Sequence, residues 1–261
     1  MPVLQYMHPV LETAPSIGSQ GEPYTVSAEF YDILQADEDD RRVRQLYGPT
    51  VATARLGVLD VGAGTGRVTL LGLAASGVDV HAVEPARSMR APLMSRLAAL
   101  PAQQRARVSV HPGTLGEADL HGIADVAVCH NTIACLAPGA RRALWPTLRT
   151  ALVPGGRLLL QLPPARVPAG ESVRELPVQR MGEHEYGGRL VTSPAGHRIR
   201  TRFDYWVRGT HTATRRHSET FWMWPAAPAE LLSDLRCHGF DASPAHHDPA
   251  VLAVVRRHAR R

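Results

Sequence analysis

A glycine-rich stretch near residue 60 constrains the fold of this chain more than any other feature. An apolar run containing Asp60 leads into it, glycines stand at alternate positions 62, 64 and 66, and an apolar, helix-compatible run follows. This order is typical of a buried strand, a tight turn and the start of a helix. Because glycine lacks a Cβ and tolerates positive φ, a ligand can lie directly against the backbone of such a turn. The amides at the start of the helix add a partly positive surface.

The spacing of the glycines distinguishes between nucleotide ligands. A dinucleotide-binding turn has the pattern Gly-x-Gly-x-x-Gly, but Arg67 stands where counting from Gly62 requires the third glycine. The pattern here is Asp60-x-Gly-x-Gly-x-Gly, which resembles the first motif of class I methyltransferases that depend on S-adenosylmethionine (SAM). Taken alone, the motif could also be a plain turn in another α/β domain.

A second motif strengthens this resemblance. Residues 78–83 alternate as a short strand that leads to Glu84, eighteen residues after Gly66. A carboxylate at the tip of the second strand can accept hydrogen bonds from both ribose hydroxyls of a nucleoside, and the family has an acidic residue there. The alternative for Glu84 is an ordinary, solvated loop glutamate. The resemblance implies SAM as cofactor, S-adenosylhomocysteine as product, and these binding residues in the two motifs: Asp60, Gly62, Ala63, Gly64, Gly66, Glu84, Pro85 and Met89.

The third strand is predicted over residues 107–111, and its loop carries Gly113, Thr114 and Leu115. The resemblance places this loop beside the adenine. The family often has Asp where Thr114 stands, so the contact to the adenine amine must come from the backbone, from Thr114 or from Glu117.

The fourth strand is predicted over residues 124–129, and its tip begins with His130 and Asn131. In proteins of this fold the tip faces the methionine end of the cofactor, so both residues are cofactor-binding candidates. A third hallmark, Leu-x-Pro-Gly-Gly-x-Leu, matches residues 152–158 and leads into an apolar fifth strand. Such a turn would also serve any other α/β fold.

The segment before the glycine turn predicts a lid. Residues 24–34 and 41–47 have helical patterns, with the acidic run 37–40 between them. In methyltransferases that act on small molecules, a comparable segment folds over the cofactor, so the resemblance makes Tyr24 and Tyr31 cofactor-binding candidates. Alternatively, Tyr31 only packs on the apolar face of a helix. Residues 1–21 show no clean period, and we expect them to be at most partly ordered.

Residues 188–224 alternate between apolar and polar positions and predict a small antiparallel sheet. This sheet resembles the substrate-side cover of small-molecule methyltransferases, among them those that methylate aminosugars. We expect Trp222, Trp224 and His217 to contact substrate, although tryptophans in a small sheet more often belong to its core. The expected fold class is α/β: a Rossmann-like, doubly wound, seven-stranded sheet with an antiparallel last strand and a β cover inserted after the fifth strand. The expected divisions are an N-terminal segment with lid helices over 1–48, the SAM-binding core over 49–162, the cover over 163–225, and the final helix and closing strands over 226–261.

Methyl transfer from a sulfonium is an in-line displacement, so the protein mainly has to align the reactants and exclude water. A general base is needed only when the nucleophile arrives protonated. His130 is our candidate for that base, because it stands where the methyl group should point and histidine titrates in a useful range. Alternatively, His130 only hydrogen-bonds to cofactor or backbone.

Composition narrows the partners. The chain of 261 residues carries a net charge of +5, but its one dense basic cluster, residues 256–261, fits a solvated tail better than a nucleic-acid groove. Cys129, Cys135 and Cys237 form no C-x-x-C pair, and no H-E-x-x-H occurs, so we expect no metal. No run approaches the ~20 apolar residues of a membrane span, and the first residues do not resemble a signal peptide, so we expect a cytoplasmic protein.

These inferences predict a SAM-dependent methyltransferase that acts on an oxygen or nitrogen atom of a small metabolite. Secondary metabolism, such as antibiotic biosynthesis, is the expected setting, with no nucleic-acid or membrane partner and with a homodimer left open. The alternatives are an RNA or protein methyltransferase and a non-catalytic SAM-binding protein.

Overall fold

The computed structural model describes residues 23–209, 213–244 and 246–258. Its centre is a seven-stranded sheet with the strand order β11-β12-β5-β4-β1-β2-β3. The strands β1 to β5 pair in parallel, β12 is antiparallel to β5, and β11 is antiparallel to β12. The predicted doubly wound sheet with an antiparallel last strand is therefore confirmed. The strands are β1 (Gly57–Val61), β2 (Asp79–Val83), β3 (Val108–His111), β4 (Ala124–Cys129), β5 (Leu152–Gln161), β11 (Phe240–Ala242) and β12 (Val251–Arg256).

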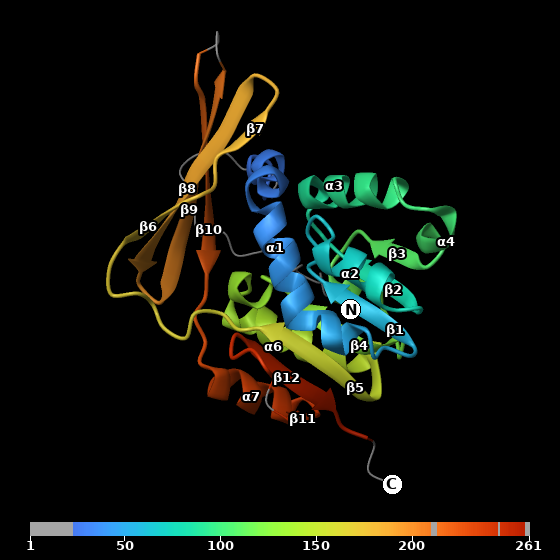
Figure 1. The fold of residues 1–261 in the computed structure, drawn as a ribbon. Coiled ribbons are helices and arrows are strands. Elements are labelled where there is room, and N and C mark those ends of the chain that lie inside the picture. Colours follow the sequence, from blue (N-terminus) through green and yellow to red (C-terminus); the bar gives the residue numbers. More distant parts are fainter. Residues whose placement is uncertain (1–22, 210–212, 245, 259–261) are drawn as a thin grey trace, which may run out of the picture.

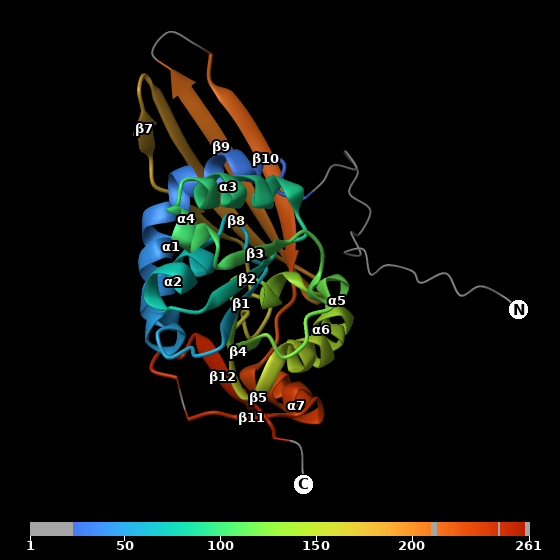
Figure 2. The ribbon, with the colours of Figure 1, turned by 90° about the vertical axis from the view of Figure 1, so that its right-hand side faces the viewer.

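Helices cover both faces of this sheet (Figure 2). One face packs against α1 (Ser27–Val51), α2 (Arg67–Ala75) and α3 (Arg87–Ala98), and the other against α6 (Pro138–Ala151) and α7 (Pro228–Cys237). Every residue of β1 is buried, as expected for a parallel strand covered on both faces. Three short helices complete the core: α4 (Ala102–Arg105), α5 (Leu115–Ala118) and the 3-10 helix η1 (Ile133–Cys135). No helix of the described residues is long and apolar enough to cross a membrane.

A second, antiparallel sheet is inserted between β5 and α7, which confirms the predicted cover. Its strand order is β10-β9-β8-β6, and β7 pairs with β8. Helix α1 lies between this cover and the core (Figure 1), and Phe30 and Leu34 of α1 form a cluster with Leu176, Tyr205 and Val207 of the cover. The short strands β6 and β7 fall in a segment whose proline, glycine and charge content gave no strand signal. The strands are β6 (Ser172–Glu175), β7 (Gln179–Met181), β8 (His184–Ala195), β9 (Arg198–Gly209) and β10 (Arg215–Met223).

Helix α1 is one continuous helix of 25 residues, whereas the sequence suggested shorter helices separated by the acidic run 37–40. The run stays helical because its charges are compensated from outside the helix. Arg67 of α2 forms ion pairs with Asp39 at 3.6 Å and with Asp40 at 2.8 Å, and a third with Asp32 at 3.0 Å.

The cover caps the N-terminus of α1. Val26 at the N-cap position has no side chain that could accept a hydrogen bond from the free backbone amides. Glu219 of β10 does this instead, since its Oε2 accepts a hydrogen bond of 2.7 Å from the Ser27 amide. A carboxylate near a helix N-terminus is also favoured by the helix dipole.

We expect Glu219→Ala to lower the free energy of unfolding by about 1 kcal/mol, the usual cost of removing an N-cap. Urea unfolding followed by circular dichroism measures this cost. The control is Glu183→Ala, because Glu183 lies in the exposed turn between β7 and β8 and forms no hydrogen bond or ion pair within the described part of the chain. Equal stability of the two variants would contradict the cap.

A buried carboxylate joins β1 to α2. Asp60 is 1% exposed, and its Oδ2 accepts a hydrogen bond of 2.7 Å from the Thr69 hydroxyl. Burial raises the pKa of Asp60 to about 7, although the bonds from Thr69 act in the opposite direction. Asp60 therefore lies beneath the glycine turn and ties it to the helix that follows.

This burial predicts a pH-dependent stability. The folded chain keeps a proton on Asp60 that the unfolded chain loses from about pH 4, so this contribution to stability is complete below about pH 4 and disappears as the pH rises to about 7. Asp60→Asn should remove the dependence, so that the variant gains on the natural protein by at most about 4 kcal/mol between pH 4 and 8. Urea unfolding across this range tests it, with Asp79→Asn at an exposed position as control. Parallel stability curves for Asp60→Asn and the natural protein would contradict the assignment.

Candidate active site

The candidate residues gather at one edge of the central sheet. Strands β1, β2, β3 and β4 are parallel neighbours, so their carboxyl ends meet at the same edge. The glycine turn follows β1, Glu84 follows β2, and His130 follows β4. Ligands of open α/β sheets bind at this edge. The topology thus brings together motifs that lie as much as 70 residues apart.

The glycine turn has the backbone that its sequence suggested. Gly62, Gly64 and Gly66 all have positive φ, at 73°, 57° and 95°. A Cβ on Gly62 would come within 2.3 Å of the Thr132 hydroxyl oxygen, so only glycine fits against the tip of β4. At Gly64, among the described residues, a Cβ would meet only the methyl group of Met89, at 3.7 Å. The turn is therefore packed tightly on the side of β4 and has more room beside Gly64 and Met89.

Glu84 is buried beside this turn, with 6% exposure. Its Oε2 accepts a hydrogen bond of 2.7 Å from the Gly64 amide, and its Oε1 accepts one of 2.8 Å from the Ala86 amide. Burial raises the pKa of Glu84 above its usual range, while the bonds from the two amides and the charge of Arg90 counteract this. Each carboxylate oxygen keeps a free lone pair, so the group can still accept bonds from two hydroxyls. The residues present therefore fit the ribose of SAM.

The loop after β3 uses its polar side chains for its own structure. Thr114 caps α5, and Glu117 bonds back to the Thr114 amide at 2.7 Å and to its hydroxyl at 2.9 Å, a reciprocal capping box. Leu115 is buried and packs with Val83 in the core. Both side chains that could have replaced the missing Asp are engaged with one another in this loop, and the source of the adenine contact stays a prediction.

The tip of β4 carries a buried histidine. His130 is 9% exposed, and its Nδ1 lies 3.1 Å from the hydroxyl of Tyr47 on α1. Burial lowers the pKa of His130 to about 4, with a further contribution from the positive charges of Arg67 and Arg42. The imidazole is therefore neutral near pH 7, but burial makes it a weaker base than a free histidine and moves its pKa below the useful range expected from the sequence.

The neighbouring Asn131 has a left-handed backbone, with φ of 53°, which is rare outside glycine and recurs at functional sites. Gln161 of β5 holds it in place by accepting a hydrogen bond of 2.9 Å from the Asn131 amide. The side-chain Nδ2 of Asn131 lies 3.3 Å from Nε2 of His130. The sequence gave no sign of Gln161, because an amide at the end of an apolar strand has no distinctive pattern.

Helix α1 contacts the glycine turn directly. Asp32 accepts hydrogen bonds from the Thr65 hydroxyl at 2.8 Å and from Arg67 at 3.0 Å, and it pairs with Arg96 of α3 at 2.7 Å. Tyr31 donates a hydrogen bond of 3.2 Å to Asp39. Tyr31 therefore lies in the same group of side chains. The ion pairs of Asp32 with Arg67 and Arg96 were not predicted, because the three residues come from three different helices.

Tyr24 lies just before helix α1 and packs against the cover. Its ring stacks on Phe221 of the cover at 4.7 Å, and its backbone has an unusual φ of 66°. Burial raises the pKa of its hydroxyl, with smaller contributions from Cys135 and from Glu84. Tyr24 therefore lies near Glu84 and near Cys135 of η1, and its cofactor-binding role stays a prediction.

The three cover residues predicted to contact substrate lie in different surroundings. His217, Glu219 and Phe221 alternate along β10 and face α1, since His217 contacts the ring of Phe30 at 5.8 Å. Trp222 falls on the other face, where Arg198 stacks over it at 4.3 Å. Trp224 is buried at the junction with α6, and its carbonyl accepts a hydrogen bond of 2.7 Å from Arg141. Of the three, only His217 has its side chain on the face toward α1.

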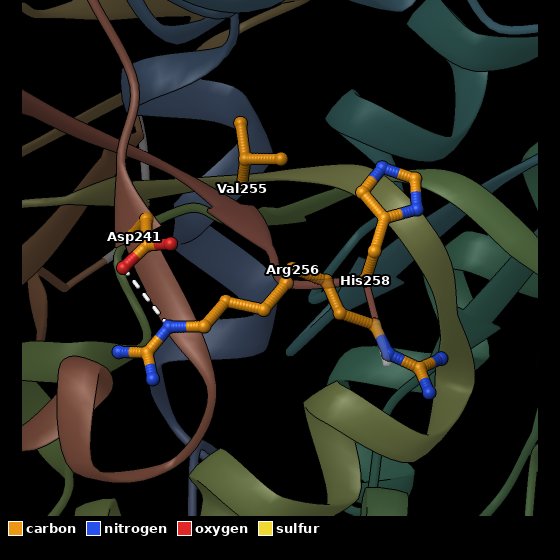
Figure 3. A pocket seen from close by; sticks show the side chains of 5 residues that line it. Asp241, Val255, Arg256 and His258 are labelled. Carbon is orange, nitrogen blue, oxygen red and sulfur yellow. Dashed lines mark hydrogen bonds and ion pairs between the residues drawn. The ribbon is translucent and has the colours of Figure 1, made fainter. Parts of the chain in front are cut away.

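Two surface hollows lie away from this edge. One, of about 460 Å³, is lined by Asp241 and residues 255–258 near the opposite edge of the sheet, where Arg257 pairs with Asp241 (Figure 3). The other, of about 510 Å³, lies on the cover around Trp206. Neither adjoins the glycine turn, which α1 covers. Within the described residues, no group of three or more His, Cys, Asp or Glu could hold a metal ion.

Comparisons with known proteins agree with this geometry. A family model described as a methyltransferase domain matches residues 59–158. No curated protein matches this chain in sequence.

Solved structures share the fold over almost the whole chain. KedS8, a sugar N-methyltransferase from Streptoalloteichus sp., has 20% identity and a TM-score of 0.68, over 97% of this chain and 100% of its own. CalS10, an amino pentose methyltransferase from Micromonospora echinaspora involved in calicheamicin biosynthesis, has 20% identity and a TM-score of 0.64, over 94% and 100%. MtfA, a glycopeptide N-methyltransferase complexed with S-adenosylhomocysteine, has 23% identity and a TM-score of 0.54, over 84% and 86%.

At these identities the solved structures establish the fold, and the family match lies on the segment that carries the glycine turn, Glu84 and His130. Residues 59–158 therefore match a methyltransferase domain, and the chain as a whole has the fold of the methyltransferases KedS8 and CalS10.

Proposed function

We propose that this protein transfers the methyl group of SAM to a nitrogen or oxygen atom of a small metabolite in a natural-product pathway. The part of this proposal that concerns SAM binding rests on one observation, the hydrogen bond of 2.7 Å from the Gly64 amide to the buried Glu84. SAM, when bound, supplies an activated methyl group and a thioether leaving group. Glu84 would hold the ribose, the glycine turn would lie against the cofactor, and Asn131 would face its methionine end.

The cover supports the small-molecule half of the proposal. It packs on α1 through Phe30 and Tyr205, whose rings stack at 4.4 Å, so the helix that contacts the glycine turn also carries the cover. The similar structures KedS8, CalS10 and MtfA act on a sugar, an amino pentose and a glycopeptide by their descriptions, and two of the three are N-methyltransferases. We therefore favour an amine acceptor, for example on a sugar, over an oxygen acceptor.

His130 is the proposed general base. Its imidazole is neutral near pH 7, because burial lowers its pKa to about 4. An amine or hydroxyl acceptor loses a proton during methyl transfer, and a neutral imidazole nitrogen can accept it. The cofactor-binding roles of Tyr24 and Tyr31, and the substrate contact of His217, are part of the same proposal.

The cofactor half predicts a loss of affinity in Glu84→Ala. Hydrogen bonds to charged groups contribute about 1.5–3 kcal/mol, so the Kd for SAM should rise about 10- to 100-fold. Isothermal titration with SAM measures this, with Glu171→Ala in the exposed part of the cover as the matched control. Circular dichroism checks that the variant is folded, and Glu84→Gln replaces it if it is not. A Kd within about twofold of the natural protein would contradict the assignment.

The proposed role of His130 as general base predicts a loss of turnover in His130→Ala. Removing a general base costs about 10²- to 10⁴-fold in rate, whereas the Kd for SAM should change by less than about threefold. Release of S-adenosylhomocysteine is assayed with an aminosugar, a phenol and a carboxylic acid, and with tRNA and a protein mixture for the alternative substrates. His121→Ala, at an exposed position, is the control. Unchanged turnover in His130→Ala would contradict the base, and methylation of tRNA or protein alone would contradict the small-molecule acceptor.

A further inference from the structure

The hydroxyl of Tyr47 is placed against the proposed base. It lies 3.1 Å from Nδ1 of His130, and the two rings meet edge to face, with centroids 5.6 Å apart at 81°. Tyr47 is fully buried on α1, in an apolar cluster with Val43, Leu46 and Val51. A buried hydroxyl without a partner destabilises the folded chain, so phenylalanine would pack better in this cluster if the hydroxyl had no partner. The hydrogen bond to His130 explains why the hydroxyl is tolerated.

The second ring nitrogen of His130 reveals the arrangement of hydrogens. Nε2 faces the side-chain amide nitrogen of Asn131 at 3.3 Å, and an amide nitrogen can only donate. In a neutral imidazole one nitrogen donates and the other accepts, so Nε2 accepts and Nδ1 carries the hydrogen, which it donates to the oxygen of Tyr47. Burial raises the pKa of Tyr47, so its hydroxyl stays neutral.

We propose that Tyr47 is a positioning residue: it supplies the acceptor that lets His130 keep its hydrogen on the buried Nδ1, and so keeps the lone pair of Nε2 ready for the proton of the acceptor substrate. This inference rests on the proposed role of His130. Asn131 is exposed, and its contact with Nε2 is long for a hydrogen bond, so an acceptor can take its place on that side.

The proton and the electron pairs balance in this arrangement. The acceptor gives a lone pair to the methyl carbon, the bond from that carbon to sulfur breaks, and its electron pair stays on sulfur. The proton that the acceptor loses moves to Nε2 of His130. The imidazolium formed keeps its Nδ1–H bonded to Tyr47, so the ring does not have to turn during the step.

The tautomer can be measured without any turnover. With ¹⁵N-labelled histidine, two-dimensional NMR of the ring nitrogens distinguishes Nδ1–H from Nε2–H. We expect His130 to show the Nδ1–H pattern in the natural protein and a mixture of tautomers in Tyr47→Phe. The matched control is Tyr205→Phe, which removes another buried hydroxyl, bonded to Ser27 at 3.1 Å, and should leave His130 unchanged. An unchanged pattern in Tyr47→Phe would overturn the inference.

Kinetics separate this role from packing. Loss of one hydrogen bond of about 1.4 kcal/mol in the transition state predicts about a tenfold fall in kcat for Tyr47→Phe, with the Kd for SAM within about twofold. Because Tyr47 acts through His130, the double variant with His130→Ala should be no slower than His130→Ala alone. A further tenfold fall in the double variant would overturn the inference.

The two proposals fail in different ways. Unchanged turnover in His130→Ala would remove the base and this inference with it. Normal turnover and a single tautomer in Tyr47→Phe, together with a slow His130→Ala, would remove the inference alone. If Tyr47→Phe does not fold, Tyr47→Leu, which also removes the hydroxyl and is smaller than the buried tyrosine, replaces it, and a tautomer pattern identical to that of the natural protein would count against Tyr47.

Discussion

The ion pairs of one buried guanidinium hold the parts of this protein together. Arg67 stands directly after the glycine turn, is 6% exposed, and meets three carboxylates of α1, of which Asp40 is nearest at 2.8 Å. Removing water from such a charge is costly, so the guanidinium is stable there only because α1 surrounds it with acidic groups. The same contacts fix α1 over the turn. Since any cofactor at the turn must lie beside α1, the position of this helix sets the shape of the site.

Helix α1 contributes to three structures at once. Its apolar side, including Leu46 and Val51, packs on the central sheet, Phe30 stacks on Tyr205 of the cover, and its first turn is capped by Glu219. Within the helix, residues Tyr31 and Tyr47 are directed toward the tip of β4 from different turns. A change in the cover can therefore reach the site through the N-terminal end of α1, and a change in the core through its C-terminal end. This shared use explains why one long helix, rather than two short ones, connects the cover to the core.

The local motifs of the site could be predicted because their chemistry is contained in a few adjacent residues. Positive φ at Gly62, Gly64 and Gly66 follows from the lack of a side chain, and the position of Glu84 follows from the length of one strand and one helix after the turn. Which cover residues face α1 could not be predicted in this way, because the answer depends on the pairing register of the cover strands. In a strand, neighbouring side chains point to opposite faces, so whether His217 or Trp222 faces α1 depends on how β10 pairs with β9, and residue type gives no information about this.

The sequence by itself determined the succession of the strands of the central sheet along the chain, the glycine turn, and the acidic residue at the tip of the second strand, because each depends on neighbours along the chain. Only the tertiary structure decided that α1 is continuous, that Glu219 caps it from 192 residues away, and that Tyr47 meets His130. These contacts join residues that are distant in sequence and carry no pattern of their own. Their energy comes from burying charges and hydroxyls that must then find partners, and which partners they find depends on how the whole chain packs.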